Sequence, residues 1–167
     1  GVEAFNKKII AASPTVYDMA AYPKTLSGKT VTAYVNTHTD LSDELYREGK
    51  LVSDNYKNIL RSQTNAAAIP AEVTVRYGVT VRRANLRNLP TGEGLFFYAS
   101  DRNFDALQET ALDPGEAVAI LHTSTNGYFY YVQAYNYRGW LSKFDVAETD
   151  RSTWLRYAEP KNFLTVV

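Results

Sequence analysis

The clearest periodic pattern in the sequence begins at residue 73, where apolar and other positions alternate. Four valines follow this pattern on the two sides of a Tyr77-Gly78 break: Val73, Val75, Val79 and Val81. A period of two residues is typical of a β-strand with one buried face. We therefore predict that β structure begins close to residue 73.

Three further strands are expected at residues 117–122, 128–135 and 136–141, because turn signals precede or separate them. Asp113-Pro114-Gly115 combines a proline that sets its backbone angle with a glycine that relieves the turn. Thr125-Asn126-Gly127 is a hairpin signal. Short strands joined by tight turns are typical of a small barrel, which we place at residues 73–148.

The first 72 residues lack this alternation and are predicted to form helices and loops. Residues 29–36 are ambiguous: their β-branched content suits a strand, whereas the spacing of Val31, Tyr34 and Val35 favours a helix, which we prefer. Ser42 is expected to cap a helix that ends at Gly49. Ser53 is expected to cap another helix, which buries its apolar side chains Tyr56, Ile59 and Leu60.

The segments between and after these elements are predicted to be loops and one more helix. Leu86 and Leu89 are assigned to a loop, and Gln108-Glu109-Thr110 to a long loop after the first strands. Thr149 or Asp150 caps a short helix that carries Trp154. Residues 149–167 are thus predicted to contain this helix and an extended stretch at 163–167 that leads toward a further module.

Composition excludes several classes of function. The 167 residues include 18 basic and 18 acidic side chains, so the net basic face of a general nucleic-acid binder is absent. The chain has no cysteine, which excludes disulfides, zinc–thiolate sites and a cysteine nucleophile within it. No apolar run approaches the roughly 20 residues that a membrane helix needs. No cofactor is expected.

The order of several short motifs resembles one known family. Leu-Arg-Asn-Leu-Pro-Thr at residues 86–91 is followed by Gln-Glu-Thr at 108–110, Pro-Gly-Glu at 114–116 and Tyr-Arg-Gly-Trp at 137–140. Together they resemble the first bacterial SH3 domain (SH3b) of NlpC/p60-type cell-wall peptidases. Residues 16–19, 22–23 and 26–28 resemble the helical segment that precedes this domain.

The resemblance implies an α+β fold in which an N-terminal helical segment packs on a small SH3-like β-barrel, with a short C-terminal helix. It also implies an extracytoplasmic bacterial protein that binds the stem peptide of peptidoglycan and works with a peptidase domain. That domain would supply the catalytic cysteine missing here. The expected function is thus a non-catalytic module for stem-peptide binding or substrate gating. A structural domain that docks a neighbouring domain without a ligand is the alternative.

Five residues are candidates for the binding site. In the family, a carboxylate and a tyrosine of this domain help to recognise the free amine of the stem peptide, which suggests Glu109 and Tyr137. Tyr135 and Trp140 are expected to supply aromatic walls, and Arg87, with Arg82 and Arg83, could meet stem-peptide carboxylates. Glu109 could instead bond its own loop, and Trp140 could fill the core. The arginines could pair with Asp101, Asp105 or Glu109.

A small hydrolase is a weaker hypothesis. His38 lies in a polar loop and His122 at the end of a predicted strand, so both are expected to be structural or exposed to solvent. No spacing suits a metal site, and no Gly-x-Ser-x-Gly motif is present.

Overall fold

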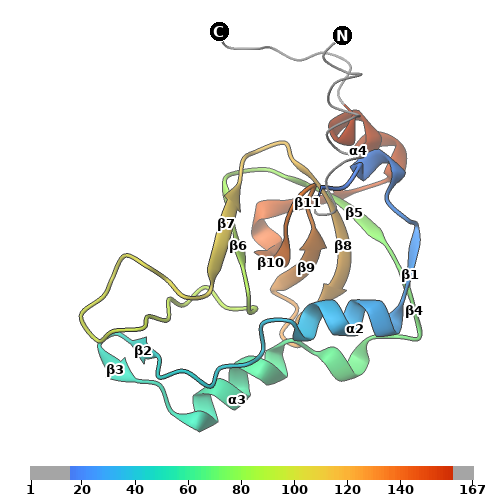
Figure 1. Ribbon diagram of the computed structural model, residues 1–167. Helices are drawn as coiled ribbons and strands as arrows, with labels where there is room; N and C mark the ends of the chain where they lie inside the picture. Colours follow the sequence, from blue (N-terminus) through green and yellow to red (C-terminus); the bar gives the residue numbers. More distant parts are fainter. Residues whose placement is uncertain (1–15, 160–167) are drawn as a thin grey trace, which may run out of the picture.

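The computed structural model describes residues 16–159, and its centre is a seven-stranded antiparallel sheet (Figure 1). The strands follow the order β11-β5-β8-β9-β10-β6-β7. They are β5 (Arg76–Thr80), β6 (Ala84–Arg87), β7 (Gln108–Leu112), β8 (Ala117–Thr123), β9 (Phe129–Gln133), β10 (Arg138–Ser142) and β11 (Val146–Thr149). The strands predicted at 117–122, 128–135 and 136–141 are confirmed as β8, β9 and β10.

Two assignments to loops were wrong. Leu86 lies in β6, and Gln108, Glu109 and Thr110 lie in β7. Strand β7 forms one edge of the sheet, and its first residues are exposed, so it lacks the apolar alternation that marks a half-buried strand. Its pairing with β6 joins segments more than twenty residues apart, which local composition does not reveal.

The described part of the chain combines this sheet with three α-helices, in keeping with the α+β class. A closed barrel, however, is not shown. Strands β11 and β7 each pair with one neighbour and form the two edges of the sheet. The β structure is therefore an open antiparallel sheet.

The N-terminal segment contains helices and short strands. Its elements are η1 (Met19–Ala21), β1 (Thr25–Ser27), α2 (Gly28–Asn36), β2 (Tyr46–Arg47), β3 (Lys50–Leu51), α3 (Asp54–Gln63), η2 (Ala66–Ala68) and β4 (Glu72–Thr74). The helix preferred at 29–36 is confirmed as α2, and the Ser53 side chain caps α3 at the Tyr56 amide as predicted. Strand β1 pairs with β4.

The helix predicted between Ser42 and Gly49 is absent. A β2–β3 hairpin stands there, and its turn places Glu48 and Gly49 at φ values of 51° and 79°. Glycine at a positive φ ends a helix but also turns a hairpin, so the sequence signal fitted both structures. In α3, Leu60 is buried as expected, whereas Ile59 is largely exposed.

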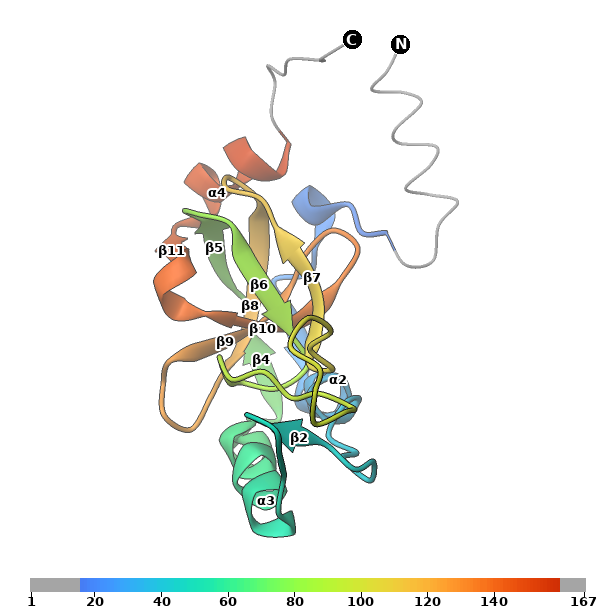
Figure 2. The ribbon, with the colours of Figure 1, turned by 90° about the vertical axis from the view of Figure 1, so that its left-hand side faces the viewer.

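The N-terminal segment and the sheet share one core, as expected from the few apolar residues that the segment has. Met19, Val31 and Val35 pack in a cluster with Val73, Ala119, Trp140 and Trp154. Helices α2 and α3 lie at one end of the sheet and α4 at the other (Figures 1 and 2). The segment and the sheet therefore bury apolar side chains against each other in this cluster, whereas a second cluster, with Leu86, Val118 and Leu141, contains no residue of the segment.

The C-terminal helix is confirmed as α4 (Arg151–Ala158), and the Asp150 side chain caps it at the Thr153 amide, 2.7 Å away. Its Trp154 is fully buried beside Tyr77, with ring centroids 4.8 Å apart. A short 3-10 turn, η3 (Lys143–Asp145), precedes β11. The extended stretch predicted at 163–167 lies outside the described residues.

Candidate functional site

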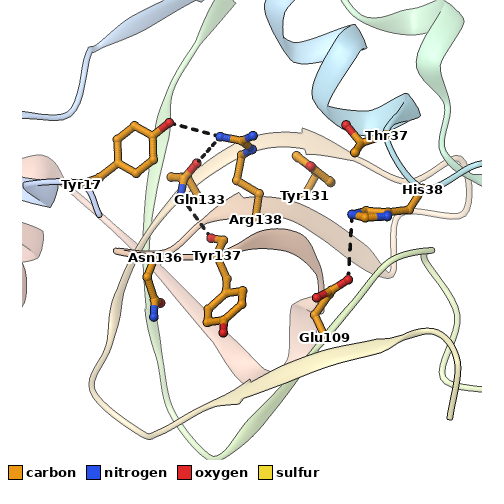
Figure 3. Close-up of a pocket in the computed structure, with 9 residues that line it drawn as sticks. All are labelled: Tyr17, Thr37, His38, Glu109, Tyr131, Gln133, Asn136, Tyr137 and Arg138. Carbon is orange, nitrogen blue, oxygen red and sulfur yellow. Dashed lines mark hydrogen bonds and ion pairs between the residues drawn. The ribbon is translucent and has the colours of Figure 1, made fainter. Parts of the chain in front are cut away.

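A small pocket lies between the N-terminal segment and one end of the sheet (Figure 3). Its volume is about 280 Å³. Part of its lining comes from the coil before η1 and from the end of α2, and the rest comes from β7, β9, β10 and the β9–β10 turn. The lining residues are Tyr17, Thr37, His38, Glu109, Tyr131, Gln133, Asn136, Tyr137 and Arg138.

Glu109 reaches the pocket because β7 has an irregularity at this residue. Leu86 of β6 lies opposite Thr110, and Arg87 lies opposite Gln108, so Glu109 has no partner across the ladder. An extra residue of this kind is a β-bulge, which bends a strand and re-aims a side chain. The bulge thus accounts for a carboxylate in the pocket at the edge of the sheet.

The Glu109 carboxylate has one basic side chain within 4.0 Å among the described residues. The His38 Nε2 atom lies 3.9 Å from Glu109 Oε1, beyond hydrogen-bonding distance. Between residues 16 and 159 no hydrogen bond reaches the Glu109 side chain, which is 32% exposed. The alternative that Glu109 bonds its own loop is therefore not observed. Asp105 has that role, since it accepts hydrogen bonds from the Leu95 and Leu107 amides.

Arg138 lies on the other side of the pocket from Glu109 and His38 (Figure 3). Its guanidinium carbon sits 3.8 Å from the centroid of the Tyr34 ring. Its Nη1 donates to the Tyr17 hydroxyl at 3.2 Å and to Gln133 Oε1 at 3.4 Å. These contacts fix the guanidinium in place at the first residue of β10.

The buried side chain of Gln133 stabilises the β9–β10 turn. Its Nε2 donates to the Ala134 carbonyl at 2.6 Å and to the Tyr137 carbonyl at 3.1 Å. Tyr131, in β9, donates its hydroxyl to the Tyr34 carbonyl at 3.1 Å. Burial raises the pKa of Tyr131 to about 12, so this hydroxyl stays neutral near pH 7 and can only act as a hydrogen-bonding group.

Of the predicted site residues, Glu109 and Tyr137 line the pocket together, and Tyr137 is 41% exposed. Tyr135 is exposed in the adjacent turn and does not line the pocket, but its carbonyl accepts a 2.6 Å hydrogen bond from the Tyr17 amide. Trp140 is fully buried, with its ring centroid 5.3 Å from that of Tyr131. The prediction of an exposed Trp140 wall was wrong, because the side chain fills the core that the sheet shares with the N-terminal segment.

Arg87 is also not available to a ligand. It is 5% exposed, and its guanidinium donates to Asp105 Oδ2 at 2.6 Å and to the Glu93 carbonyl at 2.7 Å. A paired charge buried in this way anchors the loop before β7. All three arginines form ion pairs, but only Arg87 does so with one of the expected partners, since Arg82 pairs with Asp145 and Arg83 with Asp113.

Seven of the nine lining residues were not predicted as candidates, and three of them carry side chains that can bind or orient a ligand: Tyr17, His38 and Arg138. The sequence predicts a structural or solvent-exposed role for His38, and it marks Arg138 only as part of the Tyr-Arg-Gly-Trp motif. Their positions gave only a weak signal: Tyr17 precedes η1, His38 follows α2, and Arg138 begins β10. His122, by contrast, packs into the structure, with its Nε2 2.9 Å from the Asn65 carbonyl oxygen.

The described residues contain no group of three or more acidic, histidine or cysteine side chains arranged to hold a metal ion. Among the same residues, no helix combines the length and the apolar character needed to cross a membrane.

Comparison with known proteins agrees with the resemblance inferred from the motifs. Residues 95–142 match the sequence profile of the SH3 domain of SH3b1 type, from the loop before β7 to the end of β10. No curated protein matches the chain. A solved structure of an NlpC/P60 endopeptidase from Photobacterium damselae subsp. piscicida superposes with a TM-score of 0.69 at 18% sequence identity.

The superposition covers 90% of this chain and 38% of the endopeptidase chain. The profile match shows an SH3 domain of the bacterial type at residues 95–142, and the superposition shows a fold shared with part of an NlpC/P60 endopeptidase. At this level of identity the superposition establishes a common fold.

Proposed function

We propose that the chain is a non-catalytic module of a bacterial cell-wall peptidase, and that its pocket binds the free α-amino end of a peptidoglycan stem peptide. The SH3b1 profile match and the fold shared with part of an NlpC/P60 endopeptidase support the context. Because the chain has no cysteine, the catalytic residues would lie in a separate peptidase domain. The setting would be extracytoplasmic.

The state of Glu109 is the observation that carries this proposal. A carboxylate placed in a pocket by a β-bulge, without a hydrogen bond from residues 16–159, has its acceptor positions open to a ligand. An ammonium group is the natural partner, since a charge-assisted hydrogen bond is roughly twice as strong as a neutral one. Tyr137 and His38 would flank the bound amine.

The size of the pocket favours the end of a peptide over a longer ligand. Its volume of about 280 Å³ is near the lower limit of roughly 300 Å³ for small-molecule sites. The lining is mostly polar, as expected for a charged peptide terminus. In this proposal Glu109, Tyr137 and His38 contact the ligand, Tyr135 lies at the rim, and Trp140 and Arg87 hold the scaffold.

Replacement of Glu109 by Gln tests the proposal, since it removes the charge and keeps the shape. We expect the variant to bind the tripeptide L-alanyl-γ-D-glutamyl-diaminopimelate about tenfold or more weakly, because a hydrogen bond to a charged group contributes roughly 1.5–3 kcal/mol. Glu148→Gln is the matched control, because Glu148 is also partly exposed and lies next to a basic side chain outside the pocket. NMR titration of the full chain gives the affinities, and equal affinity for wild type and Glu109→Gln would contradict the proposal.

A second candidate is a module that docks a neighbouring domain and binds no ligand. The loop between β6 and β7 favours it, since Phe97, Tyr98 and Phe104 are all at least half exposed there. Exposed aromatic side chains that gather on one loop are typical of an interaction surface. If the tripeptide does not bind to the chain at all, this second function becomes the better account.

A further inference from the structure

A second surface with unused chemistry lies at the other end of the β9–β10 pair from the pocket. Tyr128 directly precedes β9, and Phe144 lies in η3, which follows β10. Strand β10 begins at Arg138 in the pocket and ends at Ser142, beside the start of β9. We call Tyr128, Lys143 and Phe144 the aromatic patch, and none of the three lines the pocket.

The core does not use either aromatic ring of the patch. Tyr128 is 52% exposed and Phe144 is 61% exposed, and neither belongs to the buried clusters of the described residues. The two ring planes differ by 28°, and the ring centroids lie 6.0 Å apart. A flat ligand that lies against one ring is therefore nearly parallel to the other ring.

The ammonium group of Lys143 lies beside both rings. Its Nζ atom is 5.1 Å from the ring centroid of Tyr128 and 5.4 Å from that of Phe144, as in cation–π contacts. Between residues 16 and 159, this Nζ atom has no hydrogen-bond acceptor and no carboxylate partner. Its three N–H donors are thus open to a ligand that carries oxygen atoms.

Hydrogen bonds hold the backbone of the patch in place before any ligand arrives. The Tyr128 amide donates to Asn126 Oδ1 at 3.0 Å, and the Tyr128 carbonyl accepts from the Lys143 amide at 2.9 Å. The Phe144 amide donates to Ser142 Oγ at 3.3 Å. A surface with a fixed backbone loses little conformational entropy on binding, which raises the affinity that a small contact area can reach.

We propose that the aromatic patch binds sugar rings of a glycan built from β-1,4-linked N-acetylhexosamines. The C–H groups on the flat face of a pyranose stack on the rings of Tyr128 and Phe144. The Lys143 ammonium donates to the hydroxyl or acetamido oxygens of the same sugar. This surface and its ligand are separate from the pocket, so the inference does not depend on amine binding there.

The size of the patch favours a sugar over a protein partner. An aromatic side chain offers roughly 150–250 Å², so two rings that are each about half exposed leave on the order of 200 Å² for a ligand. A stable protein interface needs roughly 800 Å² on each partner. The sequence neighbours Asn126, Gly127 and Asp145 add no large apolar side chain. A pyranose is about as large as one aromatic ring, so one or two sugar units would cover this surface.

NMR titration of the full chain with the tetramer of β-1,4-linked N-acetylglucosamine tests the proposal. We expect saturable shifts at Tyr128, Lys143 and Phe144 and none at Glu109. Phe144→Ala should weaken binding about fivefold or more, because one aromatic contact is lost, whereas Tyr128→Phe keeps its ring and should retain most of the affinity. Phe104→Ala is the matched control, because Phe104 is also an exposed phenylalanine but lies in the β6–β7 loop.

Absence of saturable shifts with the tetramer would overturn the proposal, and so would shifts confined to the pocket. Equal affinities of Phe144→Ala and Phe104→Ala would also contradict it. A merely structural role for Phe144 predicts that Phe144→Ala lowers the urea midpoint and leaves the tetramer affinity of the folded protein unchanged. Because the stem tripeptide and the tetramer are expected to shift different residues, failure of this inference is distinguishable from failure of the proposed function.

Discussion

Glu109 and His122 are two titratable side chains that the fold uses in opposite ways. Glu109 points into a pocket without a hydrogen bond from the described residues, whereas His122 is packed between β8 and the segment that follows α3. Because a carbonyl oxygen is the partner of His122 Nε2, this nitrogen carries the proton and donates. Burial lowers the pKa of His122, and the nearby Arg76 charge lowers it further.

This burial predicts a loss of stability in mild acid. Near its ordinary pKa of about 6.5, His122 takes up a proton in the unfolded chain more readily than in the folded one. The contribution of neutral His122 to the free energy of unfolding is therefore complete above this pH and decreases as the pH falls below it. Urea midpoints at pH 7.5 and 5.5 should differ more for wild type than for His122→Gln, which keeps a donor but does not titrate. Equal differences for both proteins would contradict the assignment.

At the residue scale, the sequence predicted two of the residues that line the pocket and missed others. Glu109 and Tyr137 were identified because their chemistry suits an amine. Trp140 was not, because a tryptophan at the start of a strand can face solvent or core, and only its packing against Tyr131 decides between them. Arg138 was missed because its significance depends on Tyr17 and Tyr34, which are more than a hundred residues away.

At the scale of elements, the contact between the start of α2 and the backbone just before β4 positions helix α2, whose other end lies beside the pocket. Gly28 begins α2, and its amide donates to the Ala71 carbonyl at 2.7 Å. A Cβ atom at Gly28 would lie 1.9 Å from the Pro70 carbonyl oxygen. The close approach of helix and backbone thus requires glycine at this position.

Gly28→Ala should therefore destabilise the chain by at least the roughly 1–3 kcal/mol typical of overpacking, since backbone atoms must move apart. Gly92→Ala is the control, because nothing lies within 4 Å of the added atom and the backbone there is not left-handed. Urea unfolding monitored by circular dichroism measures both. If the two variants had the same midpoint, the close contact would not constrain the fold.

Most elements with local sequence signals were predicted, apart from the hairpin that replaces the helix expected between Ser42 and Gly49, and the elements that depend on distant partners were not. The turns before β8 and after it were identified from Gly115 and Gly127, and both glycines have a positive φ. The caps Ser53 and Asp150 were likewise local signals. Strands β6 and β7 were not predicted, because their pairing joins segments separated by a long loop. The bulge at Glu109 has no signature in a single sequence.

At the scale of the whole molecule, the N-terminal segment and the sheet are joined twice. They share the core that contains Val31 and Trp140, and they share the pocket, to which the segment contributes Tyr17 and His38. The expectation of a shared core came from counting apolar residues in the segment. The shared pocket could not be predicted, because it depends on how the two parts pack. The proposed recognition would therefore need both parts of the chain.

The central claim is that this pocket binds a free peptide amine, and one titration tests it most directly. Amide spectra of the isotope-labelled full chain would be followed as the γ-linked tripeptide or its N-acetyl form is added. The account predicts saturable shifts at Tyr17, His38, Glu109 and Tyr137 with the free amine and a loss of these shifts on acetylation. Identical shifts with both peptides, or shifts confined to the exposed loop around Phe97 and Phe104, would contradict it.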